Sequence, residues 1–113
     1  MEIIKGTLNL TELKKMAEEL FGDMVKAAVD IEKQALAVNA ELHSDLEALL
    51  LEKGSKQGDI WGINLYPGLD EEGFIEYDSL INMKPSQGNS SRGVDSAEIR
   101  KKISYIVKLK IKR

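Results

Sequence analysis

Apolar residues near the start of the chain recur with the spacing of a helix. Between Thr11 and Phe21 they fall three or four residues apart and so share one helical face: Leu13, Met16, Ala17, Leu20 and Phe21. Asn9 or Thr11 can accept hydrogen bonds from the first backbone N–H groups of this helix, and Gly22 can end it in a left-handed conformation. Glu2–Lys5 is short and β-prone. We therefore expect a short strand followed by the first helix.

The next two segments alternate between apolar and other residues. Val25–Ile31 and Leu36–Leu42 each place every second side chain on an apolar face, which is the spacing of a strand. Lys33-Gln34 between them would form the turn of a β-hairpin. Because alanine is common here, one long helix is the alternative, and the alternation with β-branched residues favours the two strands.

The middle of the chain predicts a second helix and another strand. Ser44 stands three residues before Glu47, the spacing of a capping box, in which each side chain accepts a hydrogen bond from a backbone N–H near the other. Gly54 ends this helix, whose apolar positions are Leu46, Leu49 and Leu50. Ile60–Tyr66 then alternates as a strand, and Pro67-Gly68 breaks it.

The last third of the chain predicts a strand, a polar loop and a helix. Phe74–Met83 alternates as a strand. Asp95 or Ser96 can cap a third helix, whose inner residues are Ile99, Ile103, Ile106 and Val107. Residues 105–112 fit both a helix and a strand, and the sequence leaves this ending open. The order β-α-β-β-α-β-β-α predicts an α+β fold in a single domain, residues 1–113, with helices packed on a mixed or mostly antiparallel sheet.

Composition fits one folded domain. Of the 113 residues, 42% are hydrophobic and 31% are charged, and this balance argues against an intrinsically disordered chain. The longest apolar runs, such as Ala48–Leu51, are too short to cross a bilayer, and the start of the chain lacks a signal-peptide pattern. We therefore expect a cytoplasmic protein without a membrane partner. The absence of cysteine excludes disulfides, iron–sulfur clusters and thiolate zinc sites.

Charge is distributed unevenly along the chain. Residues 1–83 hold 7 Lys or Arg and 17 Asp or Glu, whereas residues 84–113 hold 9 and 2. The basic end either lies across the acidic body of its own fold or meets an anionic partner. The net charge of −3 favours the first arrangement. Nucleic acid is a less favoured partner, because no row of aromatic residues is present for base stacking, and it would use Lys108, Lys110, Lys112 and Arg113.

The polar stretch Leu80–Val94 is the best candidate for a ligand site. Gly88 and Gly93 allow the backbone to turn with its amides exposed. Lys84 and Arg92 add positive charge, and Arg92 can bind a phosphate or carboxylate through two parallel hydrogen bonds. The residues expected to bind an anion are Lys84, Ser86, Gln87, Gly88, Asn89, Ser91 and Arg92. The stretch is neither a Walker loop nor a dinucleotide fingerprint, and the alternative is a flexible polar loop whose cations pair with acidic residues.

Other polar residues are weaker candidates for chemistry. His43 is the only histidine and lies between Glu41 and Asp45, while Glu76 and Asp78 project about 7 Å apart from one face of a predicted strand. Such groups can serve in acid–base catalysis, but a helix-entry histidine and a solvated strand face are the favoured explanations. The sequence assigns no catalytic residue, metal ligand or cofactor. The aromatic residues expected in the core are Trp61, Tyr66 and Tyr77.

Several stretches resemble a known family. They are Val29–Glu32, Glu41–His43, Leu50–Gln57, Trp61–Pro67 and Ile81–Val94. They are similar to a small prokaryotic family that is catalogued only as a domain of unknown function, and the last two stretches are the most specific. The resemblance covers nearly the whole chain. It implies a single-domain protein and brings no activity with it.

Three functions agree with these features. The first is a binding module that holds a small anionic or phosphate-bearing ligand at residues 84–93. The second is a structural or interaction protein, in which the basic end of one copy pairs with the acidic surface of another in a homo-oligomer. The third is a small hydrolase that joins Glu76, Asp78 and His43 to the loop cations. We rank the binding module first, although the sequence identifies no reaction.

Overall fold

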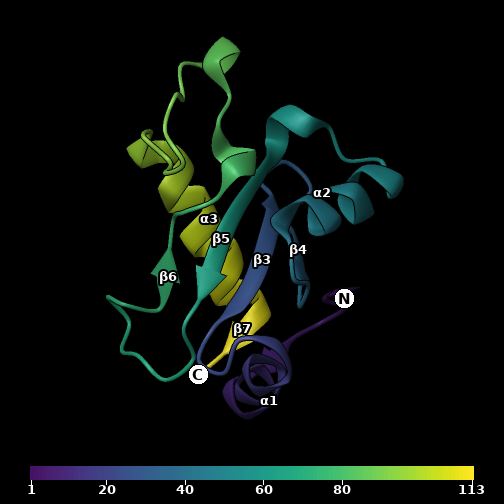
Figure 1. The fold of residues 1–113 in the computed structure, drawn as a ribbon, viewed down its shortest axis with the longest axis vertical. Coiled ribbons are helices and arrows are strands. Elements are labelled where there is room, and N and C mark those ends of the chain that lie inside the picture. The colour runs from purple at the N-terminus through teal and green to yellow at the C-terminus, as the bar shows by residue number, and fades with distance from the viewer.

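An antiparallel sheet of five strands forms the centre of the computed structural model, which describes residues 1–113 (Figure 1). The strands stand in the order β1-β4-β3-β5-β6 and are β1 (Glu2–Ile3), β3 (Val25–Asp30), β4 (Ala35–Val38), β5 (Ile60–Leu65) and β6 (Ile75–Glu76). The helices are α1 (Leu10–Leu20), α2 (His43–Glu52) and α3 (Ala97–Lys110). A separate parallel pair joins β2 (Leu8–Asn9) to β7 (Ile111–Lys112). The predicted α+β class is confirmed, and the predicted element order roughly matches.

The two faces of the sheet bury different sets of side chains. On one face, Val25, Ala27 and Val29 of β3 pack with apolar residues of α1 and α3 in the larger core. The smaller core lies on the other face under α2 and contains Ala28, Ala37, Ala40, Leu46, Leu50 and Ile60. Figure 1 shows α2 and α3 on opposite sides of the strands. The predicted hairpin is therefore confirmed, and the alternative of one long helix is wrong.

Two of the three helices begin with the side-chain caps that the sequence offers. At the start of α1, Asn9 Oδ1 accepts a hydrogen bond from the Glu12 N–H at 2.8 Å, and Glu12 Oε1 accepts one from the Asn9 N–H at 3.2 Å. Gly22, with a φ of 94°, follows the end of α1 in the left-handed conformation. At the start of α3, Ser96 Oγ accepts a hydrogen bond from the Ile99 N–H at 3.2 Å. These caps satisfy backbone donors that a helix cannot pair internally.

The capping box predicted from Ser44 and Glu47 is wrong. The helix α2 begins at His43, one residue before Ser44, and Leu42 occupies the cap position without a side-chain hydrogen bond. Asn39, with a φ of 74°, turns the chain out of β4 early, so Ser44 already lies inside the first helical turn. This earlier start also places the ring of His43 against the sheet, where it is buried.

The strand predicted over Phe74–Met83 is wrong beyond Glu76. Only the two residues of β6 pair with β5, and the chain then leaves the sheet. Farther along β5, the Asn82 side chain takes the place of a neighbouring strand. The Gly62 N–H donates to Asn82 Oδ1 at 2.7 Å, and Asn82 Nδ2 donates to the Gly62 carbonyl at 2.9 Å. Alternation in the sequence cannot distinguish this side-chain pairing from a strand.

The end of the chain contains both of the structures that the sequence left open. The helix α3 runs to Lys110, and β7 follows it directly. Lys108 Nζ lies 3.4 Å from Glu71 Oε1, and the Arg113 guanidinium lies 4.7 Å from the centre of the Phe74 ring. The basic end therefore contacts the acidic loop before β6 (Asp70–Glu72), as expected if it lies on its own fold. None of the helices has the length and apolar run needed to cross a membrane.

Candidate functional site

Most polar side chains of the loop over residues 84–93 hold the loop itself together. Asn89 is buried, and its Nδ2 donates to the carbonyls of Asn82 and Gly93 at 2.8 Å each. Its Oδ1 accepts a hydrogen bond from the Asp95 N–H at 2.9 Å. The backbone of Asn89 also pairs with that of Lys84 in both directions, at 2.7 and 3.1 Å. Asn89 is therefore occupied in closing the loop.

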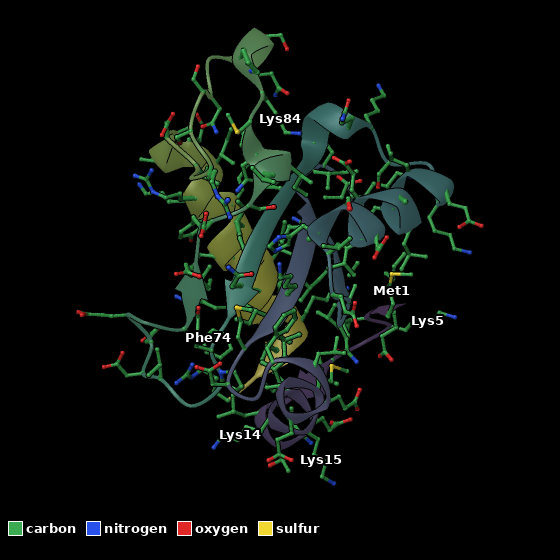
Figure 2. All side chains as sticks on the ribbon, in the orientation of Figure 1. Met1, Lys5, Lys14, Lys15, Phe74 and Lys84 are labelled. Atoms are coloured by element: carbon green, nitrogen blue, oxygen red, sulfur yellow. The ribbon has the colours of Figure 1, made fainter.

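Lys84 also serves the fold. Only 7% of the residue is exposed, and Nζ donates to the Gln57 carbonyl at 2.9 Å while lying 5.3 Å from the centre of the Trp61 ring. Figure 2 shows Lys84 at the base of the loop, beside the turn that precedes β5. Burial lowers the pKa of the Lys84 ammonium, and the charges of Glu47 and Asp59 partly oppose this. This cation is directed into the protein and away from solvent.

The other predicted ligand residues, apart from Arg92, lie on the exposed outside of the loop. Gln87 Nε2 donates to the Gly58 carbonyl at 3.2 Å, and Gly88 turns the chain with a φ of 80°. Ser91 Oγ donates to Asp95 Oδ1 at 3.0 Å. Ser86 is exposed at the same turn. These groups do not converge on one point.

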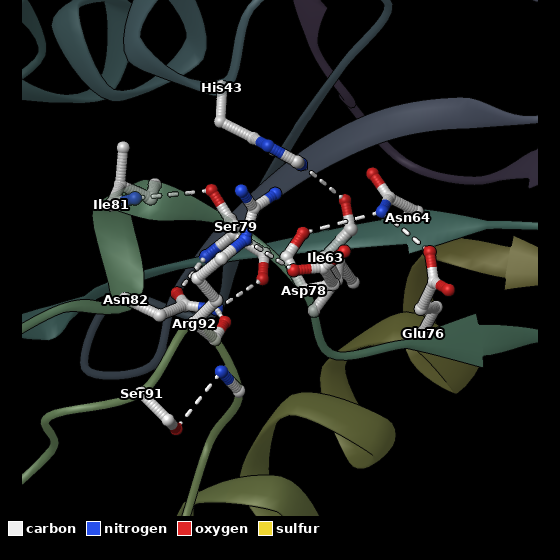
Figure 3. A network of polar contacts seen from close by, with 12 residues as sticks. His43, Ile63, Asn64, Glu76, Asp78, Ser79, Ile81, Asn82, Ser91 and Arg92 are labelled. Atoms are coloured by element: carbon white, nitrogen blue, oxygen red, sulfur yellow. Dashed lines mark hydrogen bonds and ion pairs between the residues drawn. The ribbon is translucent and has the colours of Figure 1, made fainter.

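Arg92 is the loop residue that keeps unused donors. Its Nε donates to Asp78 Oδ1 at 2.7 Å, so the ion pair that the alternative interpretation expected is present. Both terminal nitrogens make no hydrogen bond, and 55% of the side chain is exposed. Figure 3 shows the guanidinium between Asp78 and the ring of His43. The loop thus brings one partly neutralised cation beside the only histidine of the chain.

Arg92 and His43 line the same cavity, which we call the Arg92 cavity. Its volume is about 160 Å³, and it lies between the start of α2, β3 and the segment after β6. Its lining residues are Lys26, Leu42, His43, Ser44, Ser79, Leu80, Ile81 and Arg92. Side chains from β3, the start of α2 and the segment after β6 therefore line one cavity.

His43 is buried with one ring nitrogen bonded to the sheet. Its Nε2 lies 2.8 Å from the Ile63 carbonyl, and since a carbonyl only accepts, Nε2 carries the proton in the neutral ring. The Nδ1 lone pair then has no hydrogen-bond partner in the protein. Burial lowers the pKa of His43, and the nearby Lys26 charge lowers it further, while the Ile63 hydrogen bond and Asp78 act in the opposite direction. His43 is therefore a neutral hydrogen-bond acceptor near pH 7.

The two carboxylates expected on one strand face do not act together. Glu76 Oε1 accepts hydrogen bonds from the Tyr66 hydroxyl at 3.0 Å and from Asn64 Nδ2 at 2.8 Å, and Glu76 does not line the Arg92 cavity. Asp78 pairs with Arg92 instead. Figure 3 shows the two acids directed to different neighbours. No group of three or more acidic or histidine side chains is placed to hold a metal ion.

Lys26 and Ser79 are among the residues of the Arg92 cavity that the sequence interpretation missed. Lys26 interrupts the apolar pattern of β3 on the face that α2 covers, and its ammonium lies 5.4 Å from the centre of the Phe21 ring. Ser79 is buried against β5. A Cβ built on Gly62 would lie 2.6 Å from the Cβ of Ser79. A polar residue at a covered position is the signal that could have identified Lys26. Ser79 carried no such signal, because its segment was expected to be a strand.

Comparison with known proteins gives a family without an assigned activity. No curated protein and no solved structure matches the chain. The model of the family described as "Protein of unknown function (DUF5674)" matches residues 2–110. The match spans nearly the whole chain, as the resemblance in its sequence implied, and the chain therefore belongs to this family.

Proposed function

We propose that the protein is a binding module for a small phosphate-bearing ligand, held in the Arg92 cavity. One observation carries the proposal: Lys26, His43 and Arg92 come from three separate segments and line the same hollow. Lys26 and Arg92 are cations and so favour an anion, while the neutral ring of His43 adds a hydrogen-bond acceptor.

The charges around the cavity favour a negatively charged ligand. Lys26 and Arg92 are cations, and Asp78 is the acid that pairs with Arg92. Asp78 engages only Nε, so both terminal nitrogens of Arg92 can donate to two oxygens of one ligand. The hydroxyls of Ser44 and Ser79 add neutral donors at the wall. Together these groups provide more donors than a neutral ligand would use.

The state of His43 distinguishes a phosphate from a carboxylate. A neutral ring with its proton on Nε2 offers only a lone pair at Nδ1, which repels a fully ionised anion but accepts a hydrogen bond from a protonated oxygen. A phosphate ester has a second pKa of about 6, so part of it keeps a P–O–H group near neutral pH. A carboxylate is fully ionised there. The cavity is therefore better suited to a phosphate monoanion.

The mouth of the cavity is apolar. Leu42 and Leu80 line it and are 56% and 65% exposed. An apolar group attached to the phosphate would cover them. Phosphate monoesters with a small apolar alcohol are thus the expected ligands.

A titration followed by NMR or calorimetry tests this proposal. Wild-type protein should bind phenyl phosphate more tightly than inorganic phosphate, and Arg92→Gln should weaken both about tenfold, equivalent to about 1.4 kcal/mol. Lys102→Gln removes an exposed cation of α3 outside the cavity and serves as the control. If a folded Arg92→Gln protein bound phenyl phosphate as tightly as wild type, the proposed site would be wrong.

A hydrolase is the second candidate, favoured by the free Nδ1 of His43 beside Arg92. In that reaction Nδ1 would take a proton from water as the water oxygen bonds to phosphorus and the ester P–O bond breaks. Arg92 balances the negative charge, and the leaving alkoxide takes up the proton from His43 or from solvent to become the alcohol. Wild type should then release nitrophenol from p-nitrophenyl phosphate, and His43→Gln should abolish release while still binding phosphate. A wild type that binds the ester but never turns it over is a binding module only.

We also propose that the protein acts in the cytoplasm of prokaryotic cells. The absence of cysteine is compatible with a reducing compartment, where disulfides contribute nothing to stability. Fractionation of source cells with an antibody to the protein would test this, and recovery from a secreted or periplasmic fraction would contradict it.

A further inference from the structure

We infer that the protein has a second ligand site, a cavity beside its C-terminal strand that takes a small amphipathic monoanion. This cavity has a volume of about 330 Å³ and lies between the acidic loop, β6, α3 and β7. We call it the β7 cavity. It shares no lining residue with the Arg92 cavity, so the inference does not depend on the function proposed above.

The floor of the β7 cavity is part of the larger core. Phe74, Val107 and Ile111 are almost completely buried, and Ile75 packs against the same cluster. These residues come from the loop before β6, from α3 and from β7, so packed elements fix the shape of the floor. The volume falls in the lower part of the range for small-molecule sites, roughly 300–1,000 Å³. An apolar body of modest size can therefore pack against this floor.

The rim of the β7 cavity is positively charged. It carries Lys108, Lys112 and Arg113 against a single acid, Glu71. Glu71 pairs with Lys108 at 3.4 Å, but both side chains are mostly exposed, so water weakens this pair. Lys112 forms no ion pair, and its ammonium is available to a ligand. An anionic head group is therefore favoured over a neutral or cationic one.

Arg113 adds positive charge to the rim of the β7 cavity without covering its opening. Its guanidinium lies 4.7 Å from the centre of the Phe74 ring, and Nη2 donates to the Leu69 carbonyl at 3.2 Å. These contacts fix the charge over the aromatic part of the floor. Because its volume is about 330 Å³ and its rim is basic, the cavity suits one small molecule with an anionic head. A medium-chain carboxylate is the simplest compound of this class.

Calorimetric titration with sodium octanoate tests the inference, with octanol as the uncharged comparison. Wild type should bind octanoate, octanol should bind at least fivefold more weakly, and Lys112→Glu should weaken octanoate at least fivefold. Lys5→Glu makes the same charge change next to β1, at the opposite edge of the sheet from β6, and should leave affinity unchanged; Figure 2 shows Lys5 and Phe74 on opposite sides of the molecule.

A second variant tests the cavity itself without changing charge. Ser104 is half-buried in the wall, and Ser104→Leu would fill part of the space. A folded Ser104→Leu protein, recognised by a melting temperature close to that of wild type, should lose octanoate binding. Undetectable octanoate binding to wild type would overturn the inference. So would equal binding of octanol, equal losses in Lys112→Glu and Lys5→Glu, or unchanged binding in the Ser104→Leu protein.

Discussion

Lys84 and Arg92 stand at opposite ends of one polar loop and carry the same charge, yet their surroundings differ in almost every respect. Lys84 is 7% exposed and donates to a backbone carbonyl, with an aromatic ring below it. Arg92 is half-exposed, pairs with one carboxylate through Nε, and directs its free nitrogens toward a cavity. The difference teaches that a cation in a loop marks a ligand site only when the fold leaves donors unused.

The cause of the difference lies in the side chains next to each cation. Two buried amides hold the chain beside Lys84: Asn82 pairs with Gly62 of β5 as a strand would, and Asn89 Nδ2 donates to the Asn82 carbonyl. This end of the loop is therefore packed as tightly as a core. Near Arg92 these amides bond only to the backbone: the Arg92 carbonyl accepts from Ser79 N–H and from Asn82 Nδ2 at 2.9 Å each, and the Gly93 carbonyl accepts from Asn89 Nδ2 at 2.8 Å. The Arg92 side chain is left to solvent and to the cavity.

The largest effect should come from removing the amide at the buried end of the loop. Asn82→Ala leaves the Gly62 N–H and carbonyl without partners and removes one of the two hydrogen bonds to the Arg92 carbonyl, so we expect the free energy of unfolding to fall by about 3 kcal/mol. Urea denaturation measures this. Gln87→Ala removes an exposed amide with one hydrogen bond and should change stability by less than about 0.5 kcal/mol. Equal effects of the two variants would erase the contrast between the packed and open parts of the loop.

The next effect concerns ligand affinity at the open end. Arg92→Gln should weaken phenyl phosphate about tenfold while changing the free energy of unfolding by less than about 1 kcal/mol, because the Asp78 pair is half-exposed. Parallel titration and denaturation of the same sample separate the two quantities. A large loss of stability would mean that Arg92 serves the fold as Lys84 does.

A smaller effect should follow pH. The pKa of His43 is lowered in the folded state, so the unfolded chain takes up its proton first as pH falls through about 6.5. This part of the folding stability is present above that pH and is lost progressively below it. His43→Gln should flatten the pH dependence of the free energy of unfolding between about pH 7 and pH 5. If the pH dependence of the free energy of unfolding were unchanged in His43→Gln, the loss of stability at low pH would come from carboxylates and not from His43.

The smallest effect should come from replacing the buried cation. Lys84→Met keeps the length of the side chain and loses one hydrogen bond to Gln57, while it removes the cost of burying a charge. We expect a change of less than about 1 kcal/mol in the free energy of unfolding and no change in phenyl phosphate affinity. Reduced affinity would restore Lys84 to the ligand site that the sequence predicted.

Periodicity was a sound guide wherever backbone pairing decides the structure. The hairpin of β3 and β4, the strand β5 and the helices α1 and α3 follow from spacing and caps that a sequence displays. The prediction failed past Glu76 because a side-chain amide replaced a strand there. No spacing rule encodes that substitution. The early start of α2 was missed for a related reason, since the left-handed turn at Asn39 carries only a weak sequence signal.

The candidate site was predicted less completely than the fold. Arg92 and His43 were both singled out and the hydrolase hypothesis joined them, but the binding module that we ranked first used Arg92 without His43. Their meeting depends on how α2 and the segment after β6 cross the same face of the sheet. Burial decided the roles of Lys84 and Asn89, and burial is a property of tertiary packing. Residue type alone gave Lys84, Asn89 and Arg92 the same weight and made His43 a weaker candidate.

The pairing of Asn82 with Gly62 also affects how the molecule meets its neighbours in a crowded cell. Beyond the short β6, one side of β5 would otherwise present unpaired peptide groups in a strongly apolar strand, and such an edge is a template for aggregation. A single amide occupies both peptide groups there, and Ser79 packs over the glycine so that another chain cannot approach. The segment after β6, which leaves the sheet, thus blocks strand pairing at the edge of β5.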